Sequence, residues 1–395
     1  MPPAAPAASV PPSGATARLG IIGGGQLARM TALAAAPLGV EVTVIEKAAA
    51  SPGAQVVHRS VTGDWSDPAV LARFAAGLDV VTLENEFIDA GLLRGLEEAG
   101  VPVFPTSATM SFTQDKLVQK QTLAAAGLPV PEFRAVASPQ EVVAAGGELG
   151  WPLVLKARRN GYDGKGNFTL RSAADVPAGW ERLGGGRVGL YVEAFWPFEK
   201  ELAAIVTRGR NGEAVTYPVV ETVQRDHICH EVLAPAPVPP AIAARAADVA
   251  CRAVAAVGAV GSFGVEMFLA AGGRLAVNEL APRVHNSGHY TIEGCVCSQF
   301  ENHVRAVLGW PLGRAELVAP AVVMVNLLGT RSGTGRPEGL TAALAVEDAH
   351  VHLYGKASAG AGRKLGHVTA RGATMDEALG RARRAAGAIT FGDST

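Results

Sequence analysis

The chain has 395 residues, of which 48% are apolar and 18% are charged, and its formal net charge is −1. This length allows two or three domains of ~150 residues each, and the apolar fraction excludes a wholly disordered chain. The near balance of 35 basic and 36 acidic residues argues against a nucleic-acid partner, because general polyanion binding depends on excess cations. No apolar run approaches the ~18 residues that span a bilayer, so we expect no membrane partner either.

Residues 1–16 are mostly Pro, Ala and Ser and lack the charged and apolar segments of a secretory signal, so we expect a disordered leader. Four cysteines are too few for a disulfide framework in a chain this long, which favours a reducing, cytoplasmic environment.

The first elements predict a βαβ unit. Strands are expected over 18–22, 40–45 and 79–83, with a helix over 27–36. This alternation is typical of a parallel sheet covered by helices. The glycine turn at 23–25 could bind an anionic group with its N–H groups, and Glu46 stands where dinucleotide-binding proteins place a ribose-binding carboxylate. Taken alone, the turn leaves three roles open: binding a dinucleotide, binding another phosphate, or a purely structural one.

From Trp151 onward the pattern changes to strands and hairpins, which is typical of an α+β fold. Helices are expected over 114–126, 240–257 and 375–388, and strands over 153–156, 167–171, 189–195, 202–206, 215–220, 263–269, 275–279, 322–328, 350–354 and near His367. The chain is therefore predicted to combine an α/β part with α+β parts.

A basic, glycine-rich segment follows one of these strands. Only eight of the basic residues are lysines, so a lysine at the end of an apolar strand stands out. Lys156 ends the strand 153–156, where its charge could reach a nucleotide phosphate, although a surface lysine is the simpler interpretation. The segment from Arg158 to Asn167 contains three glycines with adjacent charges. This combination favours a phosphate-binding loop over a plain hairpin.

Two carboxylates interrupt a later pair of apolar strands. Glu266 lies inside one strand and Glu279 ends the next, with Asn278 beside it. A carboxylate among apolar residues is costly unless it is paired or binds a cation. The three side chains suit a Mg²⁺ site that would bridge ATP phosphates, and a salt bridge to a buried arginine such as Arg283 is the alternative.

The polar loop that follows these strands, 281–290, is the strongest functional signal in the chain. Arg283 offers a fork of donors for a carboxylate or phosphate, and we expect His285 to contact a substrate. His289 is interpreted as a histidine of the core.

The order of these residues resembles the ATP-grasp superfamily, whose two α+β lobes clasp ATP. The runs 25–27, 161–166 and 278–289 are similar, within it, to the N5-carboxyaminoimidazole ribonucleotide synthetases of purine biosynthesis, and the resemblance extends from about Arg18 to the end. It implies a Rossmann-like N-terminal (pre-ATP-grasp) domain over 17–112, an ATP-grasp domain over 113–312, and a C-terminal domain over 313–395 that completes the substrate site.

The resemblance also implies a reaction. ATP, bicarbonate and 5-aminoimidazole ribonucleotide would give N5-carboxyaminoimidazole ribonucleotide, ADP and phosphate by way of carboxyphosphate. Phosphorylation gives bicarbonate, a poor electrophile, a leaving group, and the amine then attacks either carboxyphosphate or the CO₂ released from it. Mg²⁺ or Mn²⁺ would be the metal. A cytoplasmic homodimer is implied, with hand-off of the labile product to the mutase of the next step.

Site residues follow from the matching positions. ATP would be bound by Lys116, Lys156, the phosphate lid (Gly161, Tyr162, Asp163, Gly164, Lys165, Gly166 and Asn167), the adenine hinge (Glu193, Ala194, Phe195 and Trp196), Glu201, Gln224, Asn278 and Glu279. The metal would be bound by Glu266 and Glu279. The ribonucleotide would contact Gln26, Glu84, Tyr162, Arg283, His285, Lys356, Arg363 and Lys364, with Asp163, Arg283, His285 and Lys356 as the catalytic residues. Gln224 departs from the family pattern, because some relatives carry a histidine there.

Three other functions compete with this one. A formate-using or biotin-using relative would share the superfamily's ATP site. A nicotinamide dehydrogenase would use the glycine turn and Glu46, but it would leave Lys156 and the paired carboxylates without a role. A non-catalytic regulator would bind ATP without turnover.

Overall fold

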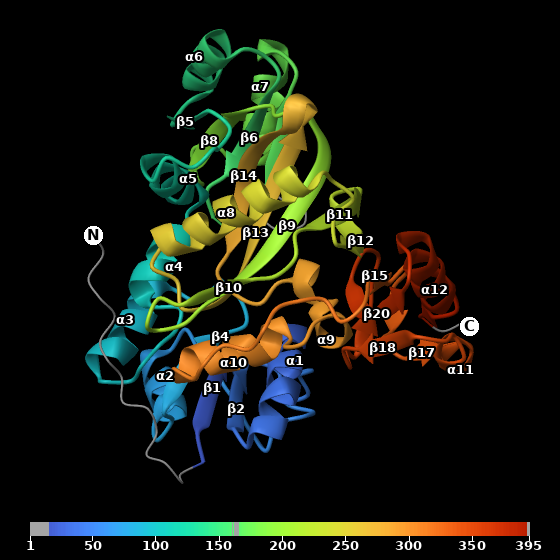
Figure 1. The fold of residues 1–395 in the computed structure, drawn as a ribbon. Helices are drawn as coiled ribbons and strands as arrows, with labels where there is room; N and C mark the ends of the chain where they lie inside the picture. Colours follow the sequence, from blue (N-terminus) through green and yellow to red (C-terminus); the bar gives the residue numbers. More distant parts are fainter. Residues whose placement is uncertain (1–15, 160, 162–165, 393–395) are drawn as a thin grey trace.

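The structure, a computed structural model, describes residues 16–159, 161 and 166–392. The predicted leader therefore falls outside the described residues except for residue 16, and so do Tyr162, Asp163, Gly164 and Lys165 of the predicted lid. Figure 1 shows the chain arranged in three parts, coloured blue, green to yellow, and red along the sequence. No helix in the described ranges is long and apolar enough to cross a membrane.

The N-terminal part is a parallel sheet covered by helices, as the βαβ pattern predicts. Its elements are β1 (Arg18–Ile22), α1 (Gln26–Ala35), β2 (Glu41–Glu46), β3 (Arg59–Thr62), α2 (Pro68–Ala75), β4 (Val80–Leu83), α3 (Ala90–Glu98) and α4 (Ser107–Thr113). The strand order is β3-β2-β1-β4. Neighbouring strand residues such as Ile21 and Ile22 enter different apolar clusters, because successive side chains point to opposite faces.

One face of this sheet is closed by a helix from much later in the chain. Helix α10 (Gln299–Leu308) places Val304, Val307 and Leu308 in the same cluster as Leu19 and Ile21 of β1. Figure 1 shows α10 in orange lying across the blue sheet. The N-terminal part is thereby anchored to the residues that follow the polar loop 281–290.

The central part contains two sheets. The smaller has the order β5-β8-β6-β7 and comprises β5 (Phe133–Val136), α6 (Pro139–Leu149), β6 (Leu153–Ala157), β7 (Asn167–Leu170), α7 (Val176–Arg182) and β8 (Leu190–Ala194). The larger receives β9 (Phe198–Arg208), β10 (Ala214–Thr216), β11 (Val220–Arg225), β12 (Ile228–Ala234), β13 (Gly261–Ala270) and β14 (Arg274–Ala281), with α5 (Lys116–Ala125) and α8 (Pro240–Ala256). Helix α8 buries small residues such as Ala250 and Ala253 against Leu202 and Phe263, so helix and sheet approach closely.

The C-terminal part continues the larger sheet instead of forming one of its own. The order is β14-β13-β9-β11-β12-β15-β20-β18, and β10 pairs with β9 at the side. The remaining elements are α9 (Thr291–Gly294), β15 (Ala321–Leu328), β16 (Gly333–Thr334), β17 (Pro337–Glu338), α11 (Leu340–Leu344), β18 (Ala349–Leu353), β19 (Ser358–Ala359), β20 (Lys364–Gly372), α12 (Met375–Gly387) and β21 (Thr390–Phe391). Arg383 of α12 also binds Glu231 of β12, with both nitrogen–oxygen distances 2.8 Å.

Most predicted elements are confirmed, and the differences have local causes. The strand expected over 215–220 is two strands, β10 and β11, separated at Tyr217–Val219, because Pro218 cannot donate a ladder hydrogen bond. Strand β9 is longer than the expected 202–206 at both ends. Strand β12 was not predicted at all, although it is the element that joins the central and C-terminal parts.

Candidate active site

A single cavity of about 860 Å³ lies where the three parts meet. It is lined by these predicted site residues: Gln26, Glu84, Lys116, Lys156, Asn167, Glu193, Ala194, Phe195, Trp196, Glu201, Gln224, Glu266, Asn278, Glu279, Arg283, His285, Lys356, Arg363 and Lys364. Gly161 lines a smaller adjoining cavity of about 200 Å³ instead. Gly166 lies directly before β7, where its carbonyl accepts a hydrogen bond from the backbone of Ala157 at the end of β6.

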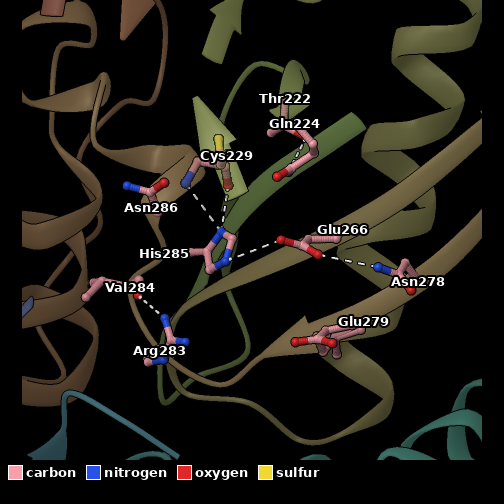
Figure 2. A network of polar contacts seen from close by, with 12 residues as sticks. Thr222, Gln224, Cys229, Glu266, Asn278, Glu279, Arg283, Val284, His285 and Asn286 are labelled. Atoms are coloured by element: carbon pink, nitrogen blue, oxygen red, sulfur yellow. Dashed lines mark hydrogen bonds and ion pairs between the residues drawn. The ribbon is translucent and has the colours of Figure 1, made fainter. Parts of the chain in front are cut away.

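The two carboxylates predicted to bind a metal face each other across neighbouring strands. Glu266 of β13 and Glu279 of β14 are direct partners in the antiparallel register, and a register shift follows at Met267. Directly opposed residues place their side chains on the same face of the sheet. Asn278 joins them there, with its amide Nδ2 3.5 Å from Oε2 of Glu266 (Figure 2). Burial and the charges of Glu279 and Glu201 raise the pKa of Glu266 to about 7.

Two lysines of the cavity are paired with carboxylates. Nζ of Lys116 lies 2.5 Å from Oε2 of Glu279. Nζ of Lys156 lies 2.7 Å from Oε2 of Glu193 and donates to Oδ1 of Asn278 at 3.3 Å. The Glu193 carboxylate, expected at the adenine hinge, thus points toward lysines. A second lysine, Lys120, lies 3.0 Å from its Oε1.

The hinge backbone is also partly used within the protein. The N–H groups of Ala194 and Phe195 donate to the carbonyls of Glu132 and Pro152, at 2.8 and 3.1 Å. Phe195 itself is 42% exposed, and its ring lines the cavity. The segment is therefore held firmly against the small sheet at the edge of the cavity.

Arg283 has a partner that the sequence analysis did not identify. Its Nε and Nη2 donate to the two carboxylate oxygens of Glu86, at 2.5 and 3.1 Å. The alternative interpretation, in which Arg283 would neutralise Glu266 or Glu279 by a salt bridge, is therefore wrong. Figure 2 shows no contact between Arg283 and either carboxylate, and a dashed line marks a further hydrogen bond from Arg283 to the carbonyl of Val284.

The position of the His285 ring is fixed by polar contacts and by packing on β13. Its Nδ1 accepts a hydrogen bond from the backbone of Ser287, so the neutral ring carries its proton on Nε2, which lies 3.5 Å from Oε1 of Glu266 (Figure 2). Burial and the neighbouring charges of Arg283 and Lys364 lower the pKa of His285 to about 3. Gly264 allows the ring to pack on β13, because a Cβ there would lie 2.5 Å from that of His285.

The side-chain amide of Gln299 holds the backbone of His285 in place. Its Oε1 accepts from the N–H of His285 at 2.9 Å, and its Nε2 donates to the carbonyl of His285 at 2.7 Å. Gln299 is fully buried at the start of α10. Nothing in its sequence context distinguishes it from other polar residues at a helix start, so only the three-dimensional structure identifies it.

The glycine turn is occupied by two carboxylates of the protein itself. The N–H of Gly24 donates to Glu46 at 3.0 Å, and the N–H groups of Gly25 and Ala28 donate to Glu84 at 2.6 and 3.2 Å. These are the groups that would bind the phosphates and ribose of a dinucleotide. The structure therefore favours a structural role for Glu46, whereas Glu84 also lines the cavity. Burial raises the pKa of Glu84.

Three basic residues of the C-terminal part complete the cavity: Lys356, Arg363 and Lys364. Nζ of Lys356 donates to the carbonyl of Lys364 at 2.7 Å and lies 5.7 Å from the centre of the Tyr354 ring. Arg363 donates to the hydroxyl of Ser358 at 2.7 Å. These contacts hold the basic cluster at the start of β20, in the same cavity as the paired carboxylates.

Three family models match successive parts of the chain. A ribonucleotide synthetase preATP-grasp domain matches residues 16–114, an ATP-grasp domain matches 121–300, and a phosphoribosylaminoimidazole carboxylase C-terminal domain matches 322–381. These three domains confirm the predicted fold class.

Whole-chain comparisons agree with these matches. The N5-carboxyaminoimidazole ribonucleotide synthase of Synechococcus elongatus is 42% identical over 89% of this chain and 88% of its own length. The enzyme of that name from Mycobacterium tuberculosis is 42% identical over 94% of this chain and 87% of its own.

Two solved structures extend the likeness to three dimensions. An N5-carboxyaminoimidazole ribonucleotide synthetase in complex with ADP has a TM-score of 0.86 and 38% identity, covering 93% of this chain and 96% of its own. The Aspergillus clavatus synthase in complex with ADP and 5-aminoimidazole ribonucleotide has a TM-score of 0.86 and 37% identity, covering 94% of this chain and 98% of its own. The chain therefore belongs to the N5-carboxyaminoimidazole ribonucleotide synthase family and is an ATP-grasp enzyme.

Proposed function

We propose that the chain carboxylates the exocyclic amine of 5-aminoimidazole ribonucleotide, using bicarbonate and ATP, for purine biosynthesis. The observation that supports this most directly is the cavity of about 860 Å³, which brings the hinge, the paired carboxylates and the C-terminal basic cluster into one space. A relative whose solved structure contains ADP and 5-aminoimidazole ribonucleotide shares this fold over 94% of the chain.

ATP would lie between the small sheet and the large sheet. Lys116 and Lys156 would bind its phosphates, and residues 161–167 would cover them. Because Ala194 and Phe195 already use their N–H groups, recognition of adenine by the hinge would fall to the backbone of Trp196. Glu201 and Gln224 line the same cavity. Glu201 would accept hydrogen bonds from the ribose hydroxyls, and Gln224 would contact the nucleotide.

Mg²⁺ would be bound by Glu266 and Glu279. Among the described residues, no three His, Cys, Asp or Glu side chains form a metal-binding group. Two carboxylates with a neighbouring amide fit a cation whose remaining ligands are phosphate oxygens and water, which is how Mg²⁺ is commonly bound beside nucleotides. When bound, Mg²⁺ neutralises charge on the transferred phosphoryl group.

The ribonucleotide would lie between the N-terminal and C-terminal parts. Gln26 and Glu84 would contact it from one side, and Lys356, Arg363 and Lys364 would bind its phosphate or the bicarbonate-derived group from the other. Arg283 would contribute its remaining N–H groups, since its Nε and Nη2 already donate to Glu86. The fixed orientation of Arg283 and His285 reduces the entropy lost when substrate binds.

Asp163 and His285 would have different roles in the proton transfer. The amine loses a proton when its nitrogen bonds to carbon. His285, with its pKa lowered to about 3, is a poor acceptor at neutral pH and would act as a hydrogen-bonding group. Asp163, assigned from the family position together with Tyr162, would accept the proton. The basic cluster would help to exclude water from carboxyphosphate, which hydrolyses readily.

A homodimer in the cytoplasm, passing its labile product to the mutase of the next step, completes the proposal. Its support is the family membership of the chain. Size-exclusion chromatography with light scattering would test the dimer.

An ADP-release assay tests the proposed reaction. ATP turnover should require bicarbonate and should rise when 5-aminoimidazole ribonucleotide is added, with one labelled carbon incorporated per ADP formed. Turnover that depends on formate, or ATP binding without any turnover, would contradict the proposal. Binding of NADH without binding of ATP would contradict membership of any ATP-dependent class.

A further inference from the structure

Lys120 is a buried lysine to which neither the predicted site nor the proposed reaction gives a role. It lies on α5, one helical turn after Lys116, and is 1% exposed. Its Nζ donates to the carbonyl of Val277 at 2.9 Å and lies 3.0 Å from Oε1 of Glu193. A lysine this deeply buried is costly unless a fixed partner compensates its charge.

Glu193 is shared between two lysines. Its Oε1 contacts Lys120 and the hydroxyl of Tyr191, at 3.0 and 3.3 Å, and its Oε2 contacts Lys156 at 2.7 Å. The two lysines lower the pKa of Glu193 to about 2, against the effect of burial. The carboxylate therefore stays ionised between the two cations.

The positions of the two lysines differ relative to the cavity. Lys156 lines the cavity and its side chain is 10% exposed, whereas the side chain of Lys120 is 1% exposed and lies behind Glu193. Lys156 and Glu193 alone would form a neutral pair with little attraction for a phosphate. With Lys120 added, the three groups carry a net charge of +1.

We propose that Lys120 is a positioning residue that offsets the charge of Glu193, so that Lys156 presents a net positive charge to the ATP phosphates. Glu193 fixes the direction of the Lys156 side chain, and Lys120 prevents that contact from cancelling the charge. The inference rests on the proposed binding of ATP phosphate by Lys156. A merely structural lysine would fill the same space without this effect on ATP.

The test compares the ATP affinity of three variants by isothermal titration calorimetry. Lys120→Met keeps the volume but leaves a neutral Lys156–Glu193 pair, so the Kd for ATP should rise about tenfold to a hundredfold, while KM for the ribonucleotide stays near that of the wild type. Lys120→Met combined with Glu193→Gln restores the net charge of +1 and should return the Kd to within about threefold of the wild type. Lys156→Met should weaken ATP binding at least as much as Lys120→Met.

A lysine outside the ATP site provides the matched control. Lys47→Met removes a lysine from the exposed Lys47–Asp64 pair and should leave the Kd for ATP unchanged. If Lys120→Met weakens binding and the double variant does not recover it, or if Lys120→Met has no effect while Lys156→Met does, the inference is wrong and the proposed function stands. If Lys156→Met leaves the Kd unchanged, the proposed role of Lys156 fails as well. Should Lys120→Met not fold, the double variant decides alone: near-normal affinity supports the inference and weak affinity overturns it.

Discussion

The contact between Glu86 and Arg283 couples the N-terminal part to the substrate loop, and its strength can be tested directly. The two carboxylate oxygens accept from Arg283 at 2.5 and 3.1 Å, and the side chains are only 23% and 20% exposed. Two unit charges about 4 Å apart attract by about 4 kcal/mol at an effective dielectric constant near 20. Because a fifth of each side chain is exposed, screening should reduce this to a coupling energy of about 2 kcal/mol.

The perturbation is a double-mutant cycle of Glu86→Gln, Arg283→Met and their combination. Each single variant leaves one charge without its partner. The losses in free energy of unfolding of the two single variants should therefore sum to more than the loss of the double variant. Urea unfolding, followed by circular dichroism and by tryptophan fluorescence to verify coincident transitions, measures the coupling.

Glu86→Gln should also raise KM for the ribonucleotide, since Arg283 loses its fixed orientation, with a smaller effect on KM for ATP. If the losses of stability add within ~0.5 kcal/mol, the contact contributes no more than a surface ion pair. The assignment of Glu86 as the partner that orients Arg283 would then be wrong.

Three further outcomes follow from the site. Glu279→Gln should abolish metal-dependent ADP release while leaving the fold intact by circular dichroism, and retained activity at ordinary Mg²⁺ concentration would remove this carboxylate from the metal site. Lys356→Ala should reduce product formation more than ribonucleotide-independent ATP hydrolysis, and an equal loss of both would place Lys356 in the ATP half of the reaction. Burial raises the pKa of Glu201 to about 7, so the ionised fraction of Glu201 increases as the pH rises through 7. The affinity for ATP should increase over the same range. Calorimetric titrations of the wild type and of Glu201→Gln from pH 5.5 to 8.5 should show a smaller increase for the variant.

The sequence predicted the parts of the site that depend on local pattern. The strands of Glu266 and Glu279 are apolar runs joined by a short turn, so their pairing and the meeting of the two carboxylates follow from hairpin geometry. The predicted hinge lies at the end of β8, the basic cluster lies between β18 and the start of β20, and both line the cavity.

The partners of these residues could not be predicted in the same way. Glu86 and Arg283 are 197 positions apart, and Lys120 reaches Val277 across 157 positions. No periodicity in a single sequence relates such distant residues, because their contact depends on how the sheets pack. The prediction for Glu46 failed for a related reason: its position after the second strand fits a ribose ligand, but in the folded chain its carboxylate accepts hydrogen bonds from the N–H groups of Lys47 and Gly24.

The ladder between β12 and β15 has a mechanical consequence. Glu231 to Ala234 pair residue by residue with Val325 to Val322, and slippage by a single position would turn every side chain of the strand to the opposite face. The C-terminal part is thus stiffly coupled to the strands of the paired carboxylates and cannot swing outward as a hinged flap. The sheet β5-β8-β6-β7 shares no ladder with the larger sheet in the described chain. Access of ATP to its binding site should therefore involve movement of that smaller sheet, while the ribonucleotide pocket keeps a nearly constant width.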